Sequence, residues 1–229
     1  MDSLHLSPRL SAVASYVPEN ARLADIGSDH GYLPANLLIN NKINFAVIGE
    51  VASGPLANAR HELSRRGLLV KTILRLADGL SAIKPQDAID TVVIAGMGGM
   101  LITTILNASL AKHNQYKTLI LQPNTDEDAV RKWLIEHNYK IENESIVQED
   151  KHFYEVIVAT PGESQLTDDD VFFGPFLRLE KSSAFVLKWQ KELSRIHLIL
   201  DKLNQADKNK TPIFSEWENK YAKIQEEIS

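Results

Sequence analysis

Residues 22–34, RLADIGSDHGYLP, carry an apolar run that ends in acids and glycines and then turns at once into a helical pattern. The run closes on Asp25, and Asp29 and Gly31 follow directly. Ligands of an open parallel sheet bind at the carboxyl ends of its strands, and glycine lets the backbone approach a ligand closely. We therefore predict a strand over 22–26, a helix over about 31–40 and a ligand-binding loop between them.

The two acids indicate what kind of ligand this loop accepts. A phosphate loop keeps the helix N-terminus open to anions, whereas here Asp25 and Asp29 stand beside it. Asp29 also occupies the second glycine position of G-x-G-x-x-G, and no Walker A motif is present, which disfavours a dinucleotide or a triphosphate. We expect a ligand that is cationic or rich in hydrogen-bond donors.

Apolar, β-branched runs alternate with helical patterns up to about residue 160. Strands are predicted at 22–26, 45–50, 71–76, 91–95, 117–122, about 141–148 and 153–159. Helices are predicted between them at about 31–40, 54–66, 99–111 and 126–138. This alternation is typical of a parallel sheet covered on both faces, and the short link between the last two strands makes one edge strand antiparallel. We expect an α/β, Rossmann-like fold with a seven-stranded, mostly parallel sheet.

Helical patterns flank the sheet at both ends of the chain. Residues 4–17 are amphipathic, and residues 159–170 carry Pro, Gly and acids that are typical of a boundary. Apolar residues then repeat at helical spacing over 185–203 and 217–228. We expect two domains, 1–162 and 163–229, the second of them an antiparallel helical hairpin of coiled-coil type.

Two details of the hairpin follow from the same pattern. Thr211 and Pro212 suit the N-cap and first turn of the second helix. Trp189 and Trp217 fall on the apolar seams, so we expect them in the hairpin core and not as platforms for stacked bases.

Composition excludes several chemistries. The 229 residues include no cysteine, and the seven histidines form no close pair, so neither a disulfide nor a metal site is expected. No secretory signal and no run long enough for a membrane span is present, so we expect a cytoplasmic protein without a membrane partner. No obligate protein partner is apparent.

Charge is distributed unevenly along the chain. The net charge is −5, yet residues 60–75 and 178–210 each hold a surplus of Lys and Arg. A basic patch on an acidic protein indicates either phosphate contacts or a solvated helix face, and the sequence leaves both open.

Four consecutive strand ends offer polar groups in a characteristic order. Asp25 and Glu50 close the first two strands, Asp78 follows the third, and glycines crowd the fourth in IAGMGGM (94–100). A carboxylate at the end of the second strand can accept hydrogen bonds from both hydroxyls of a ribose. The acid before it, Asp25, suits an amino group, and the acid after it, Asp78, suits the amine of an adenine. This order is the one expected for S-adenosylmethionine, with space beside its methyl group, and it predicts a class I methyltransferase.

The chain at this point resembles a known family, the bacterial tRNA (adenine-22-N1)-methyltransferases called TrmK. The resemblance is carried by SPRL (7–10), DIGSDHGYLP (25–34), GEV (49–51), ADGL (77–80), IAGMGG (94–99) and LQPN (121–124). It covers nearly the whole chain, including the C-terminal hairpin. It implies methyl transfer from S-adenosyl-L-methionine to N1 of adenine 22 in the D-arm region of tRNA, with S-adenosyl-L-homocysteine as product.

The resemblance also implies roles for residues at the strand ends. Asp25, Gly27 and Ser28 frame the methionine part, Glu50 and the neighbouring Val51 lie at the ribose, Asp78 and Gly79 at the adenine, and Ala95, Gly96 and Met97 border the transferred methyl. Asp29 is the expected catalytic contact to the target base, because a carboxylate near N6 stabilises the charge that N1 methylation places on the ring. The alternative is that Asp29 only caps the helix that follows.

Further residues are candidates for contacts to the base or the RNA. Gln122 and Asn124 either read an adenine edge or form a turn, and His30 either positions the base or packs. Arg9 reaches the pocket or the RNA, or merely solvates its helix. The hairpin is expected to grip the tRNA backbone through five cations: Lys181, Lys188, Lys191, Arg195 and Lys202.

Two other functions remain open at this stage. One is a class I methyltransferase that acts on another RNA or on a small molecule, which would not need the basic hairpin. The other is a cofactor-binding or RNA-binding module without catalysis.

Overall fold

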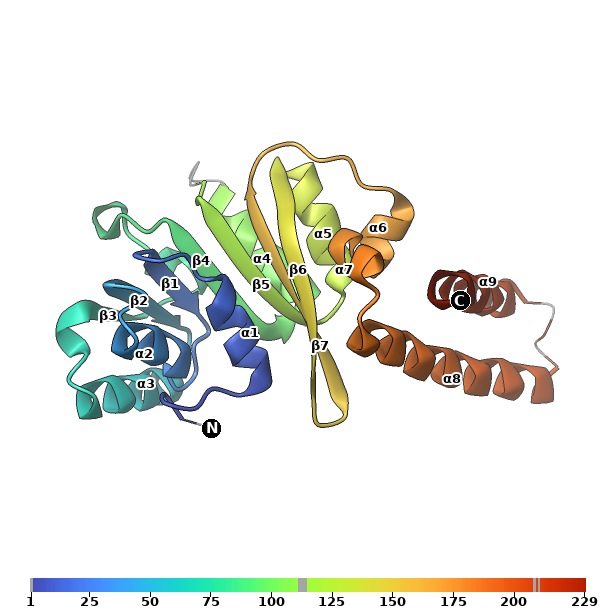
Figure 1. Cartoon of the computed structure of the whole chain (residues 1–229), viewed down its shortest axis with the longest axis horizontal. Helices are drawn as coiled ribbons and strands as arrows, with labels where there is room; N and C mark the ends of the chain where they lie inside the picture. Colours follow the sequence, from blue (N-terminus) through green and yellow to red (C-terminus); the bar gives the residue numbers. More distant parts are fainter. Residues whose placement is uncertain (1, 111–114, 208, 210) are drawn as a thin grey trace. The chain divides into compact units, whose positions relative to one another are not determined.

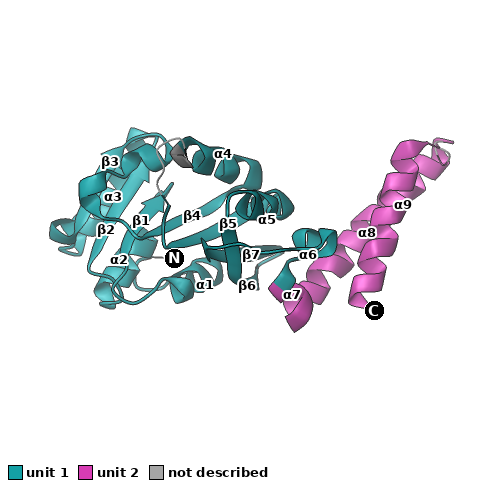
Figure 2. Cartoon of the chain, turned by 90° about the horizontal axis from the view of Figure 1, so that it is seen from above, with its two compact units in different colours: residues 1–175 teal, residues 176–229 magenta. Residues whose placement is uncertain are grey.

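The computed structural model describes residues 2–110, 115–207, 209 and 211–229. It divides into two compact units, Met1–Pro175 and Phe176–Ser229, which are coloured separately in Figure 2. The sequence places the functional boundary earlier, between residues 162 and 163, and that division stays a prediction. No helix within the described ranges is long and apolar enough to cross a membrane.

Unit 1 is built on a seven-stranded sheet of order β3-β2-β1-β4-β5-β7-β6 (Figure 1). The neighbouring pairs among β1 to β5 are parallel, whereas β7 runs antiparallel to both β5 and β6. The strands are β1 (Arg22–Ile26), β2 (Phe45–Glu50), β3 (Thr72–Leu76), β4 (Thr91–Gly98), β5 (Thr118–Thr125), β6 (Tyr139–Glu149) and β7 (His152–Pro161). The predicted seven-stranded, mostly parallel sheet is confirmed, but the expectation of an antiparallel edge strand is wrong: the antiparallel strand is β7, which lies between β5 and the edge strand β6.

Helices cover both faces of this sheet (Figures 1 and 2). One face packs against α1 (Pro8–Tyr16), α2 (Tyr32–Ile39) and α3 (Ser53–Arg65), whose apolar side chains share one core with the strands. The other face packs against α4 (Gly99–Leu110) and α5 (Glu127–Glu136). Three short 3-10 helices lie between strands: η1 (Leu69–Lys71), η2 (Gly79–Ala82) and η3 (Pro85–Asp87).

The N-terminal helix begins later than its amphipathic pattern predicts. Helix α1 starts at Pro8, because the Ser7 hydroxyl accepts a hydrogen bond from the backbone N–H of Leu10 and Pro8 suits the first helical position. The expected helix over 4–17 is therefore wrong in its first turn. This start places Arg9 in the first turn of α1, at the edge of the sheet unit.

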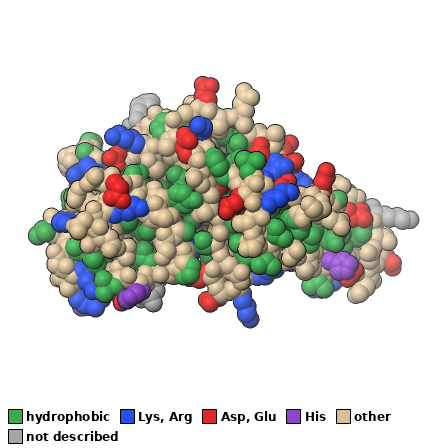
Figure 3. All heavy atoms as spheres, viewed as in Figure 1, with side chains coloured by type: hydrophobic (Ala, Val, Ile, Leu, Met, Phe, Trp, Pro, Cys, Tyr) green, Lys and Arg blue, Asp and Glu red, His purple; other side chains and the backbone are tan. Residues whose placement is uncertain are grey.

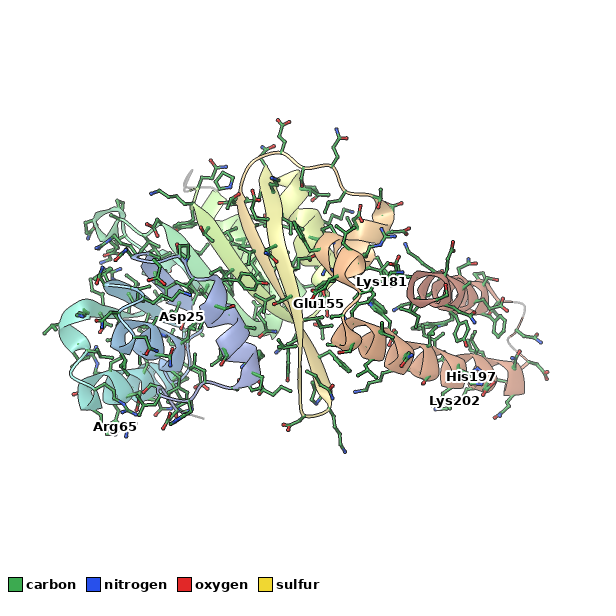
Figure 4. All side chains as sticks on the ribbon, viewed as in Figure 1. Asp25, Arg65, Glu155, Lys181, His197 and Lys202 are labelled. Carbon is green, nitrogen blue, oxygen red and sulfur yellow. The ribbon has the colours of Figure 1, made fainter. Side chains whose placement is uncertain are left out.

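Two short helices, α6 (Asp168–Phe173) and α7 (Pro175–Glu180), follow the sheet and were not predicted. A capping box between Thr167 and Asp170 starts α6. The fully buried guanidinium of Arg131 in α5 donates to the carboxylates of Glu144 and Glu155, and to the carbonyl of Val171 in α6. This ion cluster fastens α6 to α5, β6 and β7, and Figure 4 labels Glu155.

Unit 2 contains the helical hairpin of α8 (Ser183–Gln205) and α9 (Pro212–Ile228), which pack against each other. The N-cap at Thr211 with Pro212 in the first turn is confirmed. Phe185, Trp189 and Ile196 on α8 are buried, as the seam pattern predicts. Trp217 is only half-buried, and the side chains of Arg195 and Lys220 lie over its ring.

Candidate active site

The parallel pairing of β1, β2 and β4 brings their carboxyl ends together at one edge of the sheet. Ile26 is paired with Gly49 on one side and with Ile94 on the other. The loops that follow these strands therefore adjoin, and they carry the residues that the sequence singled out. Two cavities open among them, and both are lined by Gly27.

The first cavity, here called the polar cavity, has a volume of about 180 Å³. Seven of the predicted site residues line it: Arg9, Asp25, Gly27, Ser28, Asp29, Ala95 and Gly96. Side chains that sequence reasoning did not assign complete its wall, among them Leu10, Tyr32 and Leu33. Its acids and hydroxyl suit the amino end of a methionine group.

The second cavity, here called the apolar cavity, has a volume of about 260 Å³. The predicted residues Glu50, Val51, Asp78, Gly79 and Met97 line it. Leu101 and Ile105 of α4, one helical turn apart, add an apolar wall that the sequence analysis missed, although their spacing was a usable signal. An apolar cavity with two carboxylates, Glu50 and Asp78, in its wall suits an adenosine.

Gly27 lines both cavities, and its position favours glycine. Its φ of +75° is in the left-handed region, and an added Cβ would lie 2.0 Å from Cε of Met97. The thioether of Met97 thus packs directly over the Gly27 backbone, where the two cavities meet. The adjoining cavities match the two halves of S-adenosylmethionine, so these residues fit that cofactor.

Asp25 is the most perturbed acid of the site. It is buried at the end of β1, and its carboxylate accepts a hydrogen bond from the Ser28 hydroxyl. Burial raises the pKa of Asp25 to about 7, against the opposing effect of the Ser28 hydrogen bond. The neighbouring charge of Glu50 raises it further. A cationic ligand group beside Asp25 would favour the ionised carboxylate.

Glu50 connects the two cavities from the end of β2. Its carboxylate accepts a hydrogen bond from the backbone N–H of Asp29, and burial raises its pKa. This bond holds Asp29 in a left-handed conformation with φ of 55°. The residue predicted for the ribose therefore also shapes the loop that carries the predicted catalytic acid.

The Asp29 carboxylate faces solvent and does not cap α2. Its side chain is 67% exposed and lies 3.5 Å from Nε2 of His30. The N-cap of α2 is Gly31, which has no side chain to cap the helix. The structural alternative for Asp29, a helix cap, is therefore wrong. The ring of His30 stacks on Tyr32, with 5.1 Å between the ring centroids.

Arg9 lies in the wall of the polar cavity and is held from three sides. Its backbone N–H donates to Glu149 at 2.9 Å, its Nη1 donates to Oε1 of Gln122 at 2.6 Å, and its guanidinium lies 5.5 Å from the ring centroid of Tyr154. The sequence left open whether Arg9 reaches the pocket, reaches the RNA or only solvates its helix; in the structure its side chain lines the polar cavity.

Gln122 supports the site and does not face it. Its side chain is completely buried, and its amide nitrogen donates to Oδ1 of Asn124 at 3.0 Å and to the carbonyl of Pro123 at 2.8 Å. Gln122 therefore links Arg9 to Asn124, and its amide is not available to read a base. Asn124 is exposed and does not line either cavity.

The predicted RNA-binding cations of unit 2 differ in their surroundings. Lys181 pairs with Glu227, Arg195 donates twice to Glu192 at 2.7 Å, and Lys188 lies 4.9 Å from the Trp189 ring centroid. Lys191 and Lys202 are exposed. Lys208 and Lys210, which contribute to the basic surplus of this segment, lie outside the described residues.

The described part of the chain contains no group of three His, Asp or Glu side chains that could hold a metal ion.

Comparisons with known proteins agree with this geometry. The family model TrmK, described as tRNA (adenine(22)-N(1))-methyltransferase, matches residues 23–228. A tRNA (adenine(22)-N(1))-methyltransferase of Bacillus subtilis is 41% identical over 212 residues, which cover 90% of this chain and 89% of the relative.

Solved structures give the same result. A Streptococcus pneumoniae protein in complex with S-adenosyl-L-methionine superposes with a TM-score of 0.90 at 40% identity, covering 98% of this chain and 100% of the other. Mycoplasma capricolum TrmK, in complex with the cofactor product S-adenosyl-homocysteine, superposes with a TM-score of 0.87 at 31% identity, covering 97% of each chain. The family-model match and these identities over nearly the full length show that this chain belongs to the TrmK family of S-adenosylmethionine-dependent tRNA (adenine(22)-N(1))-methyltransferases.

Proposed function

We propose that the chain methylates N1 of adenine 22 in tRNA, with the methyl donor held across the two cavities that share Gly27. The observation that supports this most directly is the series of carboxylates along the sheet edge: Asp25 lines the polar cavity, and Glu50 and Asp78 line the apolar cavity. A tRNA substrate makes the cytoplasm its place of action.

Each cofactor residue has a role that its surroundings support. Asp25, with Ser28 beside it, binds the ammonium of the methionine part, and Glu50 accepts the ribose hydroxyls. Asp78 accepts a hydrogen bond from the exocyclic amine of the adenine, in the cavity that Val51 and Gly79 also line. Ala95, Gly96 and Met97 enclose the space around the transferred group. When bound, S-adenosylmethionine supplies an electrophilic methyl on a sulfonium.

Catalysis by this chain then consists mainly of alignment and charge stabilisation. Adenine N1 carries an in-plane lone pair and needs no base to activate it, so a positioned, dry pocket supplies most of the effect. N1 methylation leaves positive charge on the ring. The exposed Asp29 carboxylate stabilises that charge and accepts a proton from N6. Asn124, whose side-chain oxygen accepts a hydrogen bond from Gln122, is the second residue assigned to the base.

The target base must leave its stack to react. N1 lies on the Watson–Crick edge, which pairing and stacking keep out of reach, so the adenine is flipped out of the RNA and meets the exposed Asp29 at the mouth of the polar cavity, outside the space that the methionine part fills. The cations of the hairpin, Lys181, Lys188, Lys191, Arg195 and Lys202, bind the tRNA backbone outside the cavity.

The test is methyl transfer from labelled S-adenosylmethionine to unmodified tRNA transcripts, with the product nucleoside identified by mass spectrometry. We expect 1-methyladenosine with the wild-type chain and a loss of about 100-fold or more in kcat for Asp29→Asn, with unchanged cofactor affinity. Asp150→Asn is the matched control, because Asp150 is also exposed and left-handed, with φ of 54° against 55° for Asp29.

Two results would contradict the proposal. Cofactor binding without labelling of any tRNA would favour a binding module or another substrate. Equal activity of the Asp29→Asn and Asp150→Asn variants would remove Asp29 from the chemistry.

A further inference from the structure

The outer face of α3 carries cations that the proposed active site does not use. Arg60, His61 and Ser64 on this face are exposed. Glu62 is the one acid between Val51 and Ala77 in the sequence, and it is buried, where Ser3, Arg65 and Arg66 donate hydrogen bonds to it. The solvent side of α3 is therefore basic, although the whole chain has a net charge of −5.

The cations of this face are available to a partner. Arg60 forms no ion pair with any residue that the structure describes, and Arg65 remains 53% exposed beside Glu62. The open surface along this side of the helix is formed by Ser53, Leu56, Ala57, Arg60, His61 and Ser64. Figure 3 shows Lys and Arg side chains gathered over α3 at the lower left, and Figure 4 labels Arg65 there.

The helix that carries this basic face packs, through its buried side, against the loop of the proposed target-base site. An added Cβ on Gly31 would lie 3.2 Å from Cβ of Ala59, so the middle of α3 packs against the residue that follows Asp29 and His30. Arg60 comes directly after Ala59 in the helix. Arg65 also interacts electrostatically with Tyr32, which lines the polar cavity.

We propose that the α3 face formed by Arg60, His61, Ser64 and Arg65 binds phosphates of the tRNA nucleotides that flank the target adenine. The inference rests on the proposed function, because it takes the base at the mouth of the polar cavity to belong to an RNA. A flipped base leaves the phosphates of its neighbours outside the cavity, beside the loop that receives it. Arginine binds phosphate through a fork of N–H donors, and the Ser64 hydroxyl adds a neutral donor.

The test substitutes Arg60 in the full-length chain. For Arg60→Gln we expect KM for tRNA to rise about three- to tenfold, with unchanged kcat and unchanged KM for S-adenosylmethionine. The slope of log KM for tRNA against log salt should fall by about 0.7–0.9, the value for one lost phosphate contact. Arg60→Lys, which keeps the charge, should recover part of the affinity.

The control removes one exposed charge from the opposite edge of the sheet. Lys117 is exposed and precedes β5, so Lys117→Gln should leave KM for tRNA and the salt slope as in the wild type. Phosphate-ethylation interference locates the contact: modified phosphates next to nucleotide 22 should weaken binding of the wild type and of Lys117→Gln, but have less effect on Arg60→Gln.

The outcomes separate the inference from the proposed function. A wild-type KM and salt slope for Arg60→Gln would overturn the inference while tRNA methylation by the wild type stands. A drop in kcat or in cofactor affinity would also overturn it, since Arg60 would then act on the active site. Failure of the wild-type chain to methylate any tRNA would overturn both.

Discussion

The backbone N–H of Asp29 donates a hydrogen bond to the carboxylate of Glu50. This bond joins the end of β2 to the loop after β1, and it fixes the left-handed turn that points the Asp29 carboxylate outward. The residue assigned to the ribose and the residue assigned to the target base are therefore mechanically connected. A substitution of Glu50 should therefore alter both cofactor binding and the position of Asp29.

Substitution of Glu50 tests this connection. Glu50→Ala removes both the ribose acceptor and the acceptor for Asp29, so we expect cofactor affinity to fall about 10- to 100-fold and kcat at saturating cofactor to fall as well. Glu50→Gln keeps an oxygen that accepts from Asp29, so its kcat should stay near wild type while its cofactor affinity falls. Steady-state kinetics with both variants distinguishes the two effects, and an equal kcat for both would contradict the coupling.

The raised pKa of Asp25 makes cofactor binding depend on pH. The ammonium of the methionine part favours the ionised carboxylate, so cofactor affinity should rise about tenfold per pH unit below pH 7 and level off above it. Titration calorimetry between pH 5.5 and about 7.5, below the range where α-amino groups lose their proton, measures this slope. In Asp25→Asn binding should be weaker and nearly independent of pH. A wild-type affinity that does not change with pH would contradict the assignment.

The same group affects stability in the opposite direction. The folded-state pKa of Asp25, about 7, lies above its ordinary value of 3.8, so the folded chain holds this proton more tightly than the unfolded chain. The stabilising contribution is complete below about pH 4 and is lost as pH rises toward 7. Without cofactor, Asp25→Asn should therefore melt at a higher temperature than wild type at pH 8 and near the wild-type temperature at pH 4.

Gly27→Ala should close the junction of the two cavities. The new methyl group would meet Cε of Met97, and alanine would also adopt the left-handed φ of +75° at a cost of about 1 kcal/mol. We expect cofactor affinity to fall at least about tenfold. Adding Met97→Ala relieves the collision but not the backbone strain, so the double variant should regain only part of the affinity. Wild-type affinity in Gly27→Ala would show that the cavities are not a joint site.

Removal of exposed hairpin charges should weaken tRNA binding without changing the chemistry. In the full-length double variant Lys191→Gln/Lys202→Gln we expect a higher KM for tRNA, a shallower salt dependence, and unchanged kcat and cofactor affinity. The control is Lys132→Gln/Lys140→Gln, which removes the same charge from α5 and β6. Equal KM values for the two double variants would argue against the hairpin as an RNA-binding element.

The sequence predicts the sheet and most of the site because both depend on local signals. β1 and β2 begin and end at the predicted residues, since each is an apolar run closed by an acid or a glycine. The short helix α6 was missed because its acid run, Asp168 to Asp170, is typical of a loop until the capping box with Thr167 is recognised.

Other features depend on tertiary packing and leave little trace in the sequence. Arg9 reaches the polar cavity only because α1 docks beside β5 and β7, where Gln122 and Tyr154 hold its side chain. The outward turn of Asp29 likewise needs an acceptor from another strand, Glu50. Neither partnership is encoded by spacing within one segment.

The ion cluster of Arg131, Glu144 and Glu155 gives the last prediction, which concerns stability. All three side chains are completely buried, so Arg131→Met would leave two carboxylates in the interior without their cation. Loss of one partner from a buried ion pair costs about 3–5 kcal/mol. We expect the free energy of unfolding to fall by about this amount in denaturant titrations, while Lys132→Met, at an exposed neighbouring position, changes it by less than about 0.5 kcal/mol.

The same substitution should act locally on α6. Arg131 donates to the Val171 carbonyl at 3.3 Å, and its Nη2 would lie 2.6 Å from an added Cβ on Gly174, so the guanidinium is packed against the C-terminal half of this segment. Hydrogen exchange of residues 168–174 should therefore accelerate in Arg131→Met more than exchange in β1. A uniform change in both segments would mean that the cluster stabilises the sheet as a whole and not the attachment of α6.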